Sequence, residues 1–449
     1  MRTKTIGATY LMIGVVLAAF AAVLVAIVQA TPAPVAQGAA LIQPIVALVV
    51  LTASFVVQAS GASAAASGPA VRDVGVAAGL RRSVGDGYSI HPDDVNHDGW
   101  PDLLLGRHGG AAELFVSDPA AGTTTGFDLT YRFIDTIHDR KDRHGCAWGD
   151  VNIDGREDLY CAKGAHGGTV EKWNELWIQR PDGTFVDRAH AYGVEDIWGR
   201  GRRVAFIDLN HDRYPDLFVG NETPRRDGRP SPNRTFVNVH GTRFREVRLG
   251  LTTETGAACV QVLDVNHDGR DDLLVCGNDG LHLDVRVPRA GFVDRAGSLN
   301  VPPVHAVWAR LDDVNRDGRR DLLVERLHRF TVQFRLPSGR FGPIVYRRRL
   351  RDGTGFAIGD VDGARGNDVL LVQGCVDGRN VDDVLLLNDG DGRTWTKARV
   401  PGGIDGCGDA AATIDFDRDG MDDVVVINGG GRRGPGPDQL LTLGDWPGS

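Results

Sequence analysis

Aspartate, asparagine and glycine recur in this sequence at a spacing that suits a hard metal ion. In residues 94–102, oxygen-bearing side chains stand at positions 1, 3, 5 and 9, and a glycine stands at position 6. Calcium takes several oxygen ligands from such loops, and the helix-flanked version is the EF-hand. The apolar run Leu103-Leu104-Leu105 follows at once and favours a strand. We therefore expect a calcium loop that lies between strands rather than between helices.

The same loop occurs seven times, with its first aspartate at residues 94, 150, 208, 264, 313, 360 and 415. Several carboxylates within one turn repel each other unless a cation lies between them. Asx turns without a metal are the alternative, but turns alone need no acid at positions 1, 5 and 9. In five copies every element is present, and the predicted side-chain ligands are Asp94, Asn96, Asp98, Asp102, Asp150, Asn152, Asp154, Asp158, Asp264, Asn266, Asp268, Asp272, Asp313, Asn315, Asp317, Asp321, Asp415, Asp417, Asp419 and Asp423. Position 7 is expected to bind only through its main-chain carbonyl, so its side chain varies: Trp100, Arg156, Arg270, Arg319 and Met421.

Two copies depart from the pattern. The third has Arg213 where glycine belongs, and a positive φ at that position would cost about 1 kcal/mol. Its predicted ligands are all retained: Asp208, Asn210, Asp212 and Asp216. The sixth has Ala364 at a ligand position, and we expect it to be weak or empty. Its remaining predicted ligands are Asp360, Asp362 and Asp368.

The charge balance agrees with ion binding. The seven loops place 22 of the 59 acidic residues at ligand positions, and five calcium ions would carry the formal net charge from −9 to +1. We therefore predict about five to seven calcium ions. The acidic total and the absence of a basic stripe exclude nucleic acid as the expected partner.

The loops repeat at intervals of 47 to 58 residues, a period typical of solenoids or propellers. In each unit one apolar strand enters the loop and a second leaves it, as at 146–149 and 158–160. A third strand and a tight turn follow, as at 175–178 and 181–183, and then a fourth strand at 184–187. Seven units of four strands predict an all-β, seven-bladed β-propeller. An open superhelical stack is the alternative.

The two ends of the repeat region complement each other. After the last loop the chain supplies a second strand and a third, near Gln439–Leu443, but no fourth. Residues Val71–Leu80 have the pattern of Phe185–Val194 and of Phe292–Leu299. We therefore expect the N-terminal strand to complete the last blade and to leave no unpaired edge.

The repeated D-x-[DN]-x-D-G-x-x-D-[LV] loop, followed by a G-x-F pattern in the fourth strand, resembles the FG-GAP/VCBS repeat family. The best-known members are the seven-bladed propellers of integrin α subunits. The resemblance covers residues 71–449 and is specific because it is sevenfold. It implies a calcium-bound propeller, usually extracellular, that acts in adhesion or ligand binding.

All six cysteines lie in the repeat region, and two pairs straddle an acidic loop with the same cross-strand offset. Those pairs suggest hairpin disulfides, which leaves two cysteines to join neighbouring repeats, although sequence alone allows about 15 connectivities. Disulfides favour an oxidising compartment, so we expect a secreted or extracytoplasmic domain. The proposed pairs are Cys146–Cys161, Cys259–Cys276 and Cys375–Cys407.

The N-terminus has the features of a membrane signal. Arg2 and Lys4 precede an uncharged apolar run from Ile6 to Val28, so residues 1–30 read as a signal peptide or signal anchor. Residues 31–70 contain a second hydrophobic segment and an Ala/Ser/Gly-rich linker. Two uncleaved spans would leave the propeller cytoplasmic, whereas one cleaved signal or one span would export or anchor it. The short linker has no Lys or Arg, so the positive-inside rule does not decide on which side of a membrane the propeller would lie.

Calcium held between the first two strands is usually structural, so we expect function on the opposite face of the ring. The leading hypothesis is a module that binds a protein or glycan ligand there, with adhesion as one use. A carbohydrate-active protein, either a lectin or a polysaccharide lyase, is the second, and a purely structural role is the third. No catalytic motif is found in the sequence. The candidate residues of that face are His91, Lys141, Arg143, His144, Arg202, Arg203, His305, His108, His166, Glu222 and His328.

Overall fold

The structure is a computed structural model in which contacts separate two units, Met1–Gly68 and Pro69–Ser449. The described residues all belong to the second unit: 71–80, 87–107, 111–118, 126–133, 142–250, 256–288, 291–364, 366–377, 379–398, 400, 407–431, 434–435 and 438–443. The predicted segments 1–30 and 31–70 lie outside them. Within the described ranges, no helix is both long and apolar enough to cross a membrane.

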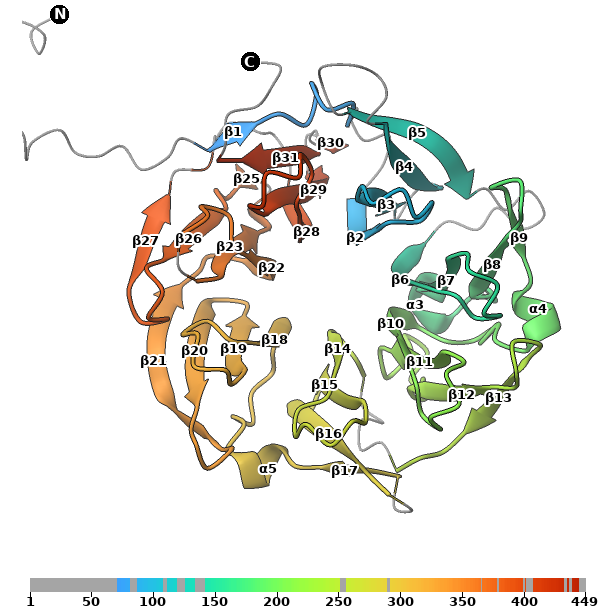
Figure 1. Ribbon diagram of the computed structural model, residues 1–449. Coiled ribbons are helices and arrows are strands. Elements are labelled where there is room, and N and C mark those ends of the chain that lie inside the picture. Colours follow the sequence, from blue (N-terminus) through green and yellow to red (C-terminus); the bar gives the residue numbers. More distant parts are fainter. Residues whose placement is uncertain are drawn as a thin grey trace, which may run out of the picture. The chain divides into compact units, whose positions relative to one another are not determined.

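Seven four-stranded antiparallel sheets surround a central axis, with the strand that enters each acidic loop innermost (Figure 1). This arrangement confirms the predicted seven-bladed propeller of four-stranded blades. The first blade contains β2 (Gly87–Asp93), β3 (Asp102–Arg107), β4 (Ala112–Asp118) and β5 (Gly126–Phe133). The second contains β6 (Arg143–Gly149), β7 (Asp158–Lys163), β8 (Glu175–Gln179) and β9 (Phe185–Asp187). The third contains β10 (Gly201–Ile207), β11 (Asp216–Asn221), β12 (Arg234–Asn238) and β13 (Phe244–Val247).

The remaining blades follow the same order in the chain. The fourth contains β14 (Val260–Leu263), β15 (Asp272–Cys276), β16 (Leu281–Val287) and β17 (Gly291–Asp294). The fifth contains β18 (Trp308–Asp312), β19 (Asp321–Arg326), β20 (Arg329–Arg335) and β21 (Phe341–Arg349). The sixth contains β22 (Gly353–Gly359), β23 (Asp368–Gln373), β26 (Val384–Asn388) and β27 (Trp395–Ala398). The seventh contains β28 (Cys407–Ile414), β29 (Asp423–Gly431), β31 (Gln439–Thr442) and β1 (Arg72–Asp73), with β1 outermost: Arg72 lies opposite Thr442 and Asp73 opposite Leu441.

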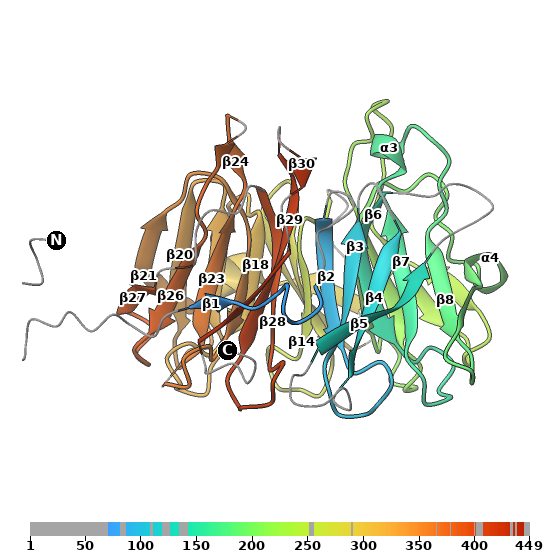
Figure 2. The same cartoon turned by 90° about the horizontal axis from the view of Figure 1, so that it is seen from above.

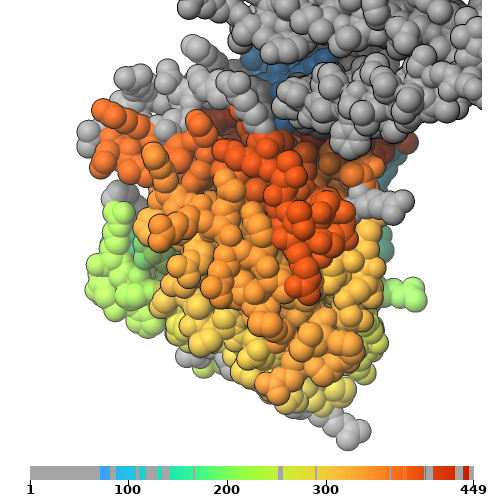
Figure 3. All heavy atoms as spheres, turned by 90° about the vertical axis from the view of Figure 1, so that its left-hand side faces the viewer, coloured from blue at the N-terminus to red at the C-terminus, as the bar shows by residue number. Residues whose placement is uncertain are grey.

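The two faces of the ring differ. The acidic loops join the first strand of each blade to the second, and the connections between second and third strands lie on the other face, here called the connection face. That face carries α3 (Ala165–Gly168), the hairpin β24 (Cys375–Val376)–β25 (Arg379–Asn380) and β30 (Gly434–Pro435), as Figure 2 shows. The short helices α4 (Ala189–Tyr192) and α5 (Ala296–Leu299) follow the fourth strands of their blades. Figure 3 views the ring from the side on which β21 and β27 lie. These are the outermost strands of the fifth and sixth blades.

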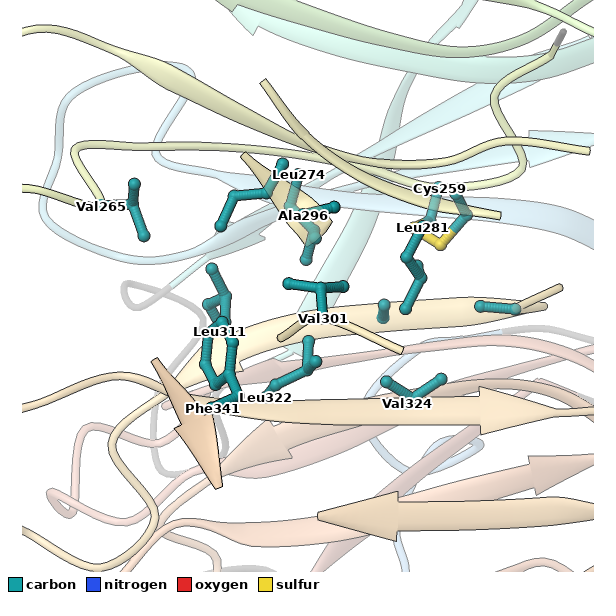
Figure 4. Packing of buried hydrophobic residues seen from close by; sticks show 14 of the residues in the cluster. Cys259, Val265, Leu274, Leu281, Ala296, Val301, Leu311, Leu322, Val324 and Phe341 are labelled. Carbon is teal, nitrogen blue, oxygen red and sulfur yellow. A yellow bond between two sulfur atoms is a disulfide. The ribbon is translucent and has the colours of Figure 1, made fainter. Parts of the chain in front are cut away.

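Each interface between blades has its own hydrophobic core. Seven clusters of buried residues occur within the described residues, and each joins two neighbouring sheets. Between the fourth and fifth blades, Leu274 and Leu281 pack against Leu311 and Val324 (Figure 4). A blade is apolar on both faces, so it is stable only when both neighbours cover it.

Two predicted disulfides are confirmed. Cys146 lies directly opposite Cys161 across β6 and β7, with an S–S distance of 2.05 Å, and Cys259–Cys276 bridges the fourth blade at 1.98 Å. Cys375 is disulfide-bonded as well. The side chain of Cys407, and with it the predicted third pairing, lies outside the described side chains.

In five inner strands (β2, β6, β10, β22 and β28) the register shifts by one residue at the second or third residue of the strand, near the connection face. Such β-bulges re-aim a side chain and are common next to functional sites. The residues that the strand register skips are Tyr88, His144, Arg202, Thr354 and Asp409.

Candidate metal sites and the connection face

The side chains of each acidic loop are oriented by the loop's own main chain. In the first loop, Asp94 Oδ1 and Oδ2 accept hydrogen bonds from the N–H groups of Asp98 (3.0 Å) and Gly99 (2.8 Å). Asn96 Oδ1 accepts from Asp98 N–H (3.0 Å), and Asp98 Oδ1 accepts from Trp100 N–H (2.8 Å). The second, fourth and fifth loops repeat this set of bonds to positions 1 and 5. These bonds hold several oxygen atoms of one loop close together, as a site for a hard cation requires.

The aspartate at position 9 has a structural task that the sequence did not reveal. Asp102 is fully buried and accepts hydrogen bonds from Val95 N–H and, across the blade, from Ser117 N–H, both at 3.0 Å. Asp216 does the same with Leu209 N–H (2.8 Å) and Asn238 N–H (2.6 Å). This carboxylate therefore fastens the loop to the end of the third strand in its own blade.

The residue at that third-strand end also reaches the neighbouring blade. Asn238, whose N–H binds Asp216, donates from Nδ2 to the carbonyl of Val151 in the preceding acidic loop (2.7 Å). Asn388 bridges Asp368 and the Val314 carbonyl in the same way, at 2.7 Å for each bond. Two arginines form the equivalent bond to the preceding loop. The guanidinium of Arg286 donates to the Leu209 carbonyl and that of Arg335 to the Val265 carbonyl, each at 2.7 Å. Acidic loops of adjacent blades are thus joined by a repeated polar bridge.

Burial and mutual repulsion perturb these carboxyl groups. Burial raises the pKa of Asp102 to about 6, and the nearby Asp98 and Asp94 carboxylates raise it further against the effect of two N–H donors. Burial likewise raises to about 7 the pKa of the equivalent aspartates of five other loops: Asp158, Asp216, Asp321, Asp368 and Asp423. A bound divalent cation would favour the charged form of all these groups.

The sixth and seventh loops bring three carboxylates together. Oxygen atoms of Asp360, Asp362 and Asp368 lie within 4.8 Å of one another, as do those at positions 1, 3 and 5 of the seventh loop. In both loops the position-1 aspartate has a buried Oδ1 with no hydrogen-bond partner, in Asp360 and in Asp415. An orphaned carboxylate oxygen inside an acidic cluster fits a cation site. The sixth loop, which the sequence marks as the weakest, therefore remains a candidate.

Two loop positions have a left-handed backbone. Position 6 is glycine with φ near +80° in most loops, and Arg213 adopts φ 73° at that position in the third, as the sequence predicted. The bond from position 6 to the first aspartate lengthens there, with Arg213 N at 3.4 Å from Asp208 Oδ2 against 2.8 Å for Gly99 N to Asp94 Oδ2. Position 4 is also left-handed, which the sequence analysis missed: His97, Ile153, His211, His267, Arg316, Gly363 and Arg418 all have φ between 54° and 64°.

The side chains at position 7 form contacts that the sequence analysis did not predict. Arg156, Arg270 and Arg319 each form an ion pair with the position-5 aspartate of the same loop, at 3.3 Å for Arg270 Nη1 and Asp268 Oδ2. Trp100 instead lies under the guanidinium of Arg418 from the seventh loop, 5.0 Å from the ring centroid. A cation bound by position 5 would compete with these arginines for the same carboxylate.

The candidate residues on the connection face divide into buried and exposed groups. Arg143 is buried and pairs with Glu175 (2.6 Å), which also binds Lys163 (2.7 Å), so it is structural rather than a surface contact. His144 is buried too: Nε2 bonds Asp142 (2.7 Å) and Nδ1 lies 3.2 Å from Arg202 Nη1. With both ring nitrogens engaged, His144 is not poised as a catalytic base.

The other candidates are scattered. Arg202 and Arg200 share Glu222, at 2.6 and 2.8 Å. His305 and His328 are exposed at the fifth blade, and His328 Nδ1 lies 2.8 Å from the Arg351 carbonyl. His91 and Arg203 face the central axis instead. Lys141, His108 and the His166 side chain lie outside the described residues.

Exposed apolar side chains gather on the connection face. Among the described residues, four of the seven exposed large hydrophobic side chains belong to its connections: Val170, Trp198, Leu327 and Val376. Trp198 is 43% exposed and stacks with the guanidinium of Arg225, 5.1 Å from its ring centroid. Tryptophan and arginine are enriched in the hot spots of protein interfaces.

The fold and the loops define a class: a seven-bladed propeller with an acidic loop in every blade. Residues 150–219 match the model of the FG-GAP-like repeat family. Cartilage acidic protein 1 of Xenopus tropicalis is 34% identical over 106 residues, which are 23% of this chain and 14% of that protein. Integrin alpha-5 of Xenopus laevis is 24% identical over 208 residues, which are 40% of this chain and 19% of that protein. The chain therefore carries FG-GAP-like repeats and resembles the integrin α-type propeller.

These matches cover less than a fifth of the length of either relative. Among solved structures, BBS1N in its complex with ARL6DN aligns over 80% of this chain and 94% of its own, with 11% identity and a TM-score of 0.47.

Replacement of Arg213 by glycine tests the left-handed backbone at position 6. R213G should raise the free energy of unfolding by about 1 kcal/mol, because glycine has no Cβ to strain at φ 73°. The reciprocal G269R should lower it by a similar amount, since a Cβ at Gly269 meets no other atom within 4 Å and the cost lies in the backbone. Urea unfolding in excess chelator measures both without a contribution from metal. Equal stability of R213G and the parent protein would contradict the strain.

Proposed function

We propose that the chain is a calcium-binding, extracytoplasmic β-propeller that acts as an interaction module. The observation that carries this proposal is the sevenfold acidic loop, whose oxygens are pre-oriented by main-chain N–H groups. We infer that the predicted ligands of about five to seven loops hold calcium. The ions would neutralise the carboxylates and lock each blade's inner hairpin, which leaves the connection face for a ligand.

Calcium removal tests the first half of the proposal. EDTA should lower the melting temperature strongly and added calcium should restore it, because each site adds about 2.7 kcal/mol at a hundredfold excess of ion over Kd. The double variant D264N/D268N should bind one ion fewer by elemental analysis. D182N, at a turn outside the loops, is the control and should bind the full number. A melting temperature that EDTA leaves unchanged would refute the calcium assignment.

We propose an exported location for the chain, which the two hairpin disulfides support. The hairpin disulfides suit an oxidising compartment. We propose that residues 1–30 are a signal peptide or signal anchor, that residues 31–70 are a second hydrophobic segment and linker, and that the propeller occupies 71–449. Membrane anchoring through the N-terminus remains part of this proposal.

We further propose that a protein or glycan ligand binds the connection face around the second and third blades. The exposed Trp198, its stacked partner Arg225 and the nearby Arg200–Glu222 pair support this location. A lectin-like role would use the same aromatic surface. Lyase chemistry finds less support, because His144 is buried and engaged on both nitrogens.

Substitution of Trp198 tests the ligand face. In affinity capture from the native exterior with calcium present, W198A should bind the specific ligand at least about tenfold more weakly, because truncation of a hot-spot residue costs about 2 kcal/mol or more. L336A is the matched control: Leu336 is 41% exposed, but its β20–β21 turn lies on the acidic-loop face. The same loss in both variants, or in neither, would contradict the assignment.

We also infer that the N-terminal strand is needed to close the ring. Beyond the pairing of β1 with β31, Val71 lies in the core between the sixth and seventh blades. Val74, Ala78 and Leu80 lie in the core between the seventh and first. One short segment therefore contributes to both interfaces of the last blade.

A pair of aspartate substitutions tests this closure. Val74 is 8% exposed and its N–H binds the Leu440 carbonyl (2.8 Å), so V74D should destabilise by about 3 kcal/mol through an unpaired buried charge. Val76 is 77% exposed, and V76D should change stability by less than about 0.5 kcal/mol. Chemical denaturation in calcium compares the two. Equal effects of V74D and V76D would rule out a closing role for this segment.

A further inference from the structure

A cavity of about 420 Å³ lies on the axis of the ring, among the inner strands β2, β6, β10, β18, β22 and β28. Small side chains create the space. Four blades place an alanine three residues before the acidic loop: Ala147, Ala205, Ala357 and Ala412. A cavity of this volume is within the range of small-molecule sites.

Hydrogen-bond donors outnumber acceptors in this cavity. His91 Nε2 accepts from Cys146 N–H (3.1 Å), which places the proton on Nδ1, and within the described part of the chain Nδ1 donates to no residue. Burial, and then the nearby Arg203, lowers the pKa of His91 to about 3, so the ring stays neutral. Ser89 Oγ and Trp308 Nε1 also line the cavity and are buried without a partner.

Two arginines from different blades supply the charge. Arg203 donates from Nη1 to the carbonyls of His144 (3.1 Å) and Arg202 (3.2 Å), and its guanidinium lies 4.7 Å from the centroid of the Trp308 ring. The Arg310 guanidinium forms no hydrogen bond or ion pair with any described residue, and burial lowers the pKa of Arg310 against the opposing effect of the Asp312 carboxylate. In the described residues, neither guanidinium has a carboxylate within ion-pair distance.

The cavity has few acidic groups to balance these cations. Asp93 is the acidic residue among those that line it, and Asp93 Oδ1 already accepts from Asp94 N–H (2.9 Å). A single negative charge would therefore bring the lining close to neutral, whereas a dianion would exceed it. Apolar side chains surround the remaining space: Ile90, Trp148, Phe356 and Ile358.

We infer that this axial cavity is a binding site for a small monocarboxylate with an apolar or aromatic body. The planar guanidinium groups match a carboxylate in geometry and in charge. Donors from His91, Trp308 and Ser89 lie in the same cavity, and the alanines and aromatic rings accommodate the body. This site is separate from the Trp198 surface and goes beyond the ligand binding proposed for it.

Side chains from the bulged ends of the inner strands lie near the connection-face end of the cavity. Tyr88 and His144 contact each other with ring centroids 4.2 Å apart, and His144 Nδ1 meets Arg202 Nη1 at 3.2 Å. These side chains belong to consecutive blades and lie at the positions where register shifts.

Titration calorimetry on the full chain in calcium tests the inference. Benzoate and 3-phenylpropionate are the probes, with benzamide as the neutral counterpart of benzoate and inorganic phosphate as a second anion. We expect one molecule bound per chain, and binding at least about tenfold weaker for benzamide and for phosphate. R310Q should weaken benzoate binding at least about tenfold, because it removes a charge without removing any hydrogen bond within the described residues. R347Q, at an exposed residue of β21 in the same blade, should leave binding unchanged.

A second variant keeps the test decisive if R310Q does not fold. A205L retains both arginines and narrows the cavity, so it should weaken benzoate binding at least about tenfold while the melting temperature of the ligand-free protein stays close to that of the parent. Three outcomes would each overturn the inference. The first is no saturable binding of either carboxylate up to about 10 mM, a range in which even millimolar affinity is detected. The second is benzoate binding retained in both R310Q and A205L, and the third is benzamide or phosphate bound as tightly as benzoate.

Discussion

The buried aspartate at the ninth position of each acidic loop is the group on which the architecture depends. In the first four loops and the sixth, its two oxygens bind the main chain at the start of the loop and at the end of the third strand, as Asp102 binds Val95 and Ser117. Without those N–H donors the carboxyl group would be buried and unpaired, which costs several kcal/mol. The same acid therefore fixes the geometry of the blade and would supply negative charge to the proposed cation site, so that a substitution there would affect both.

The bridges between blades extend this local arrangement around the ring. Asn238 binds the acid of its own blade through the main chain and the preceding loop through its side chain. Hydrophobic contacts hold neighbouring blades together. They do not define the position of one blade relative to the next along the ring axis, because the hydrophobic effect is not directional. Directional hydrogen bonds between successive loops supply that register. An ion that orders one loop would thereby also order the loop carbonyl that accepts a hydrogen bond from the next blade.

Much of this structure could be predicted from the sequence, because the informative patterns are local. The spacing of the loops, the strands at 158–160 and 216–219 and the Cys146–Cys161 pair follow from turn chemistry and alternation within one hairpin. The bridges could not be predicted, since their partners lie 70 to 87 residues apart and either Asn or Arg serves. Nor could the burial of Arg143, which depends on Glu175 in a strand 32 residues further on.

The pairing of β1 with β31 has a mechanical consequence. Arg72 lies opposite Thr442 and Asp73 opposite Leu441, so the chain that leads into β1 and the chain that leaves β31 exit at the same end of an antiparallel pair. Tension between those two exits loads the pair as a zipper, one hydrogen bond after another, rather than in shear across all of them at once. A pull in that direction would peel open the seventh blade at low force while the covalently clipped hairpins of the second and fourth blades stay intact.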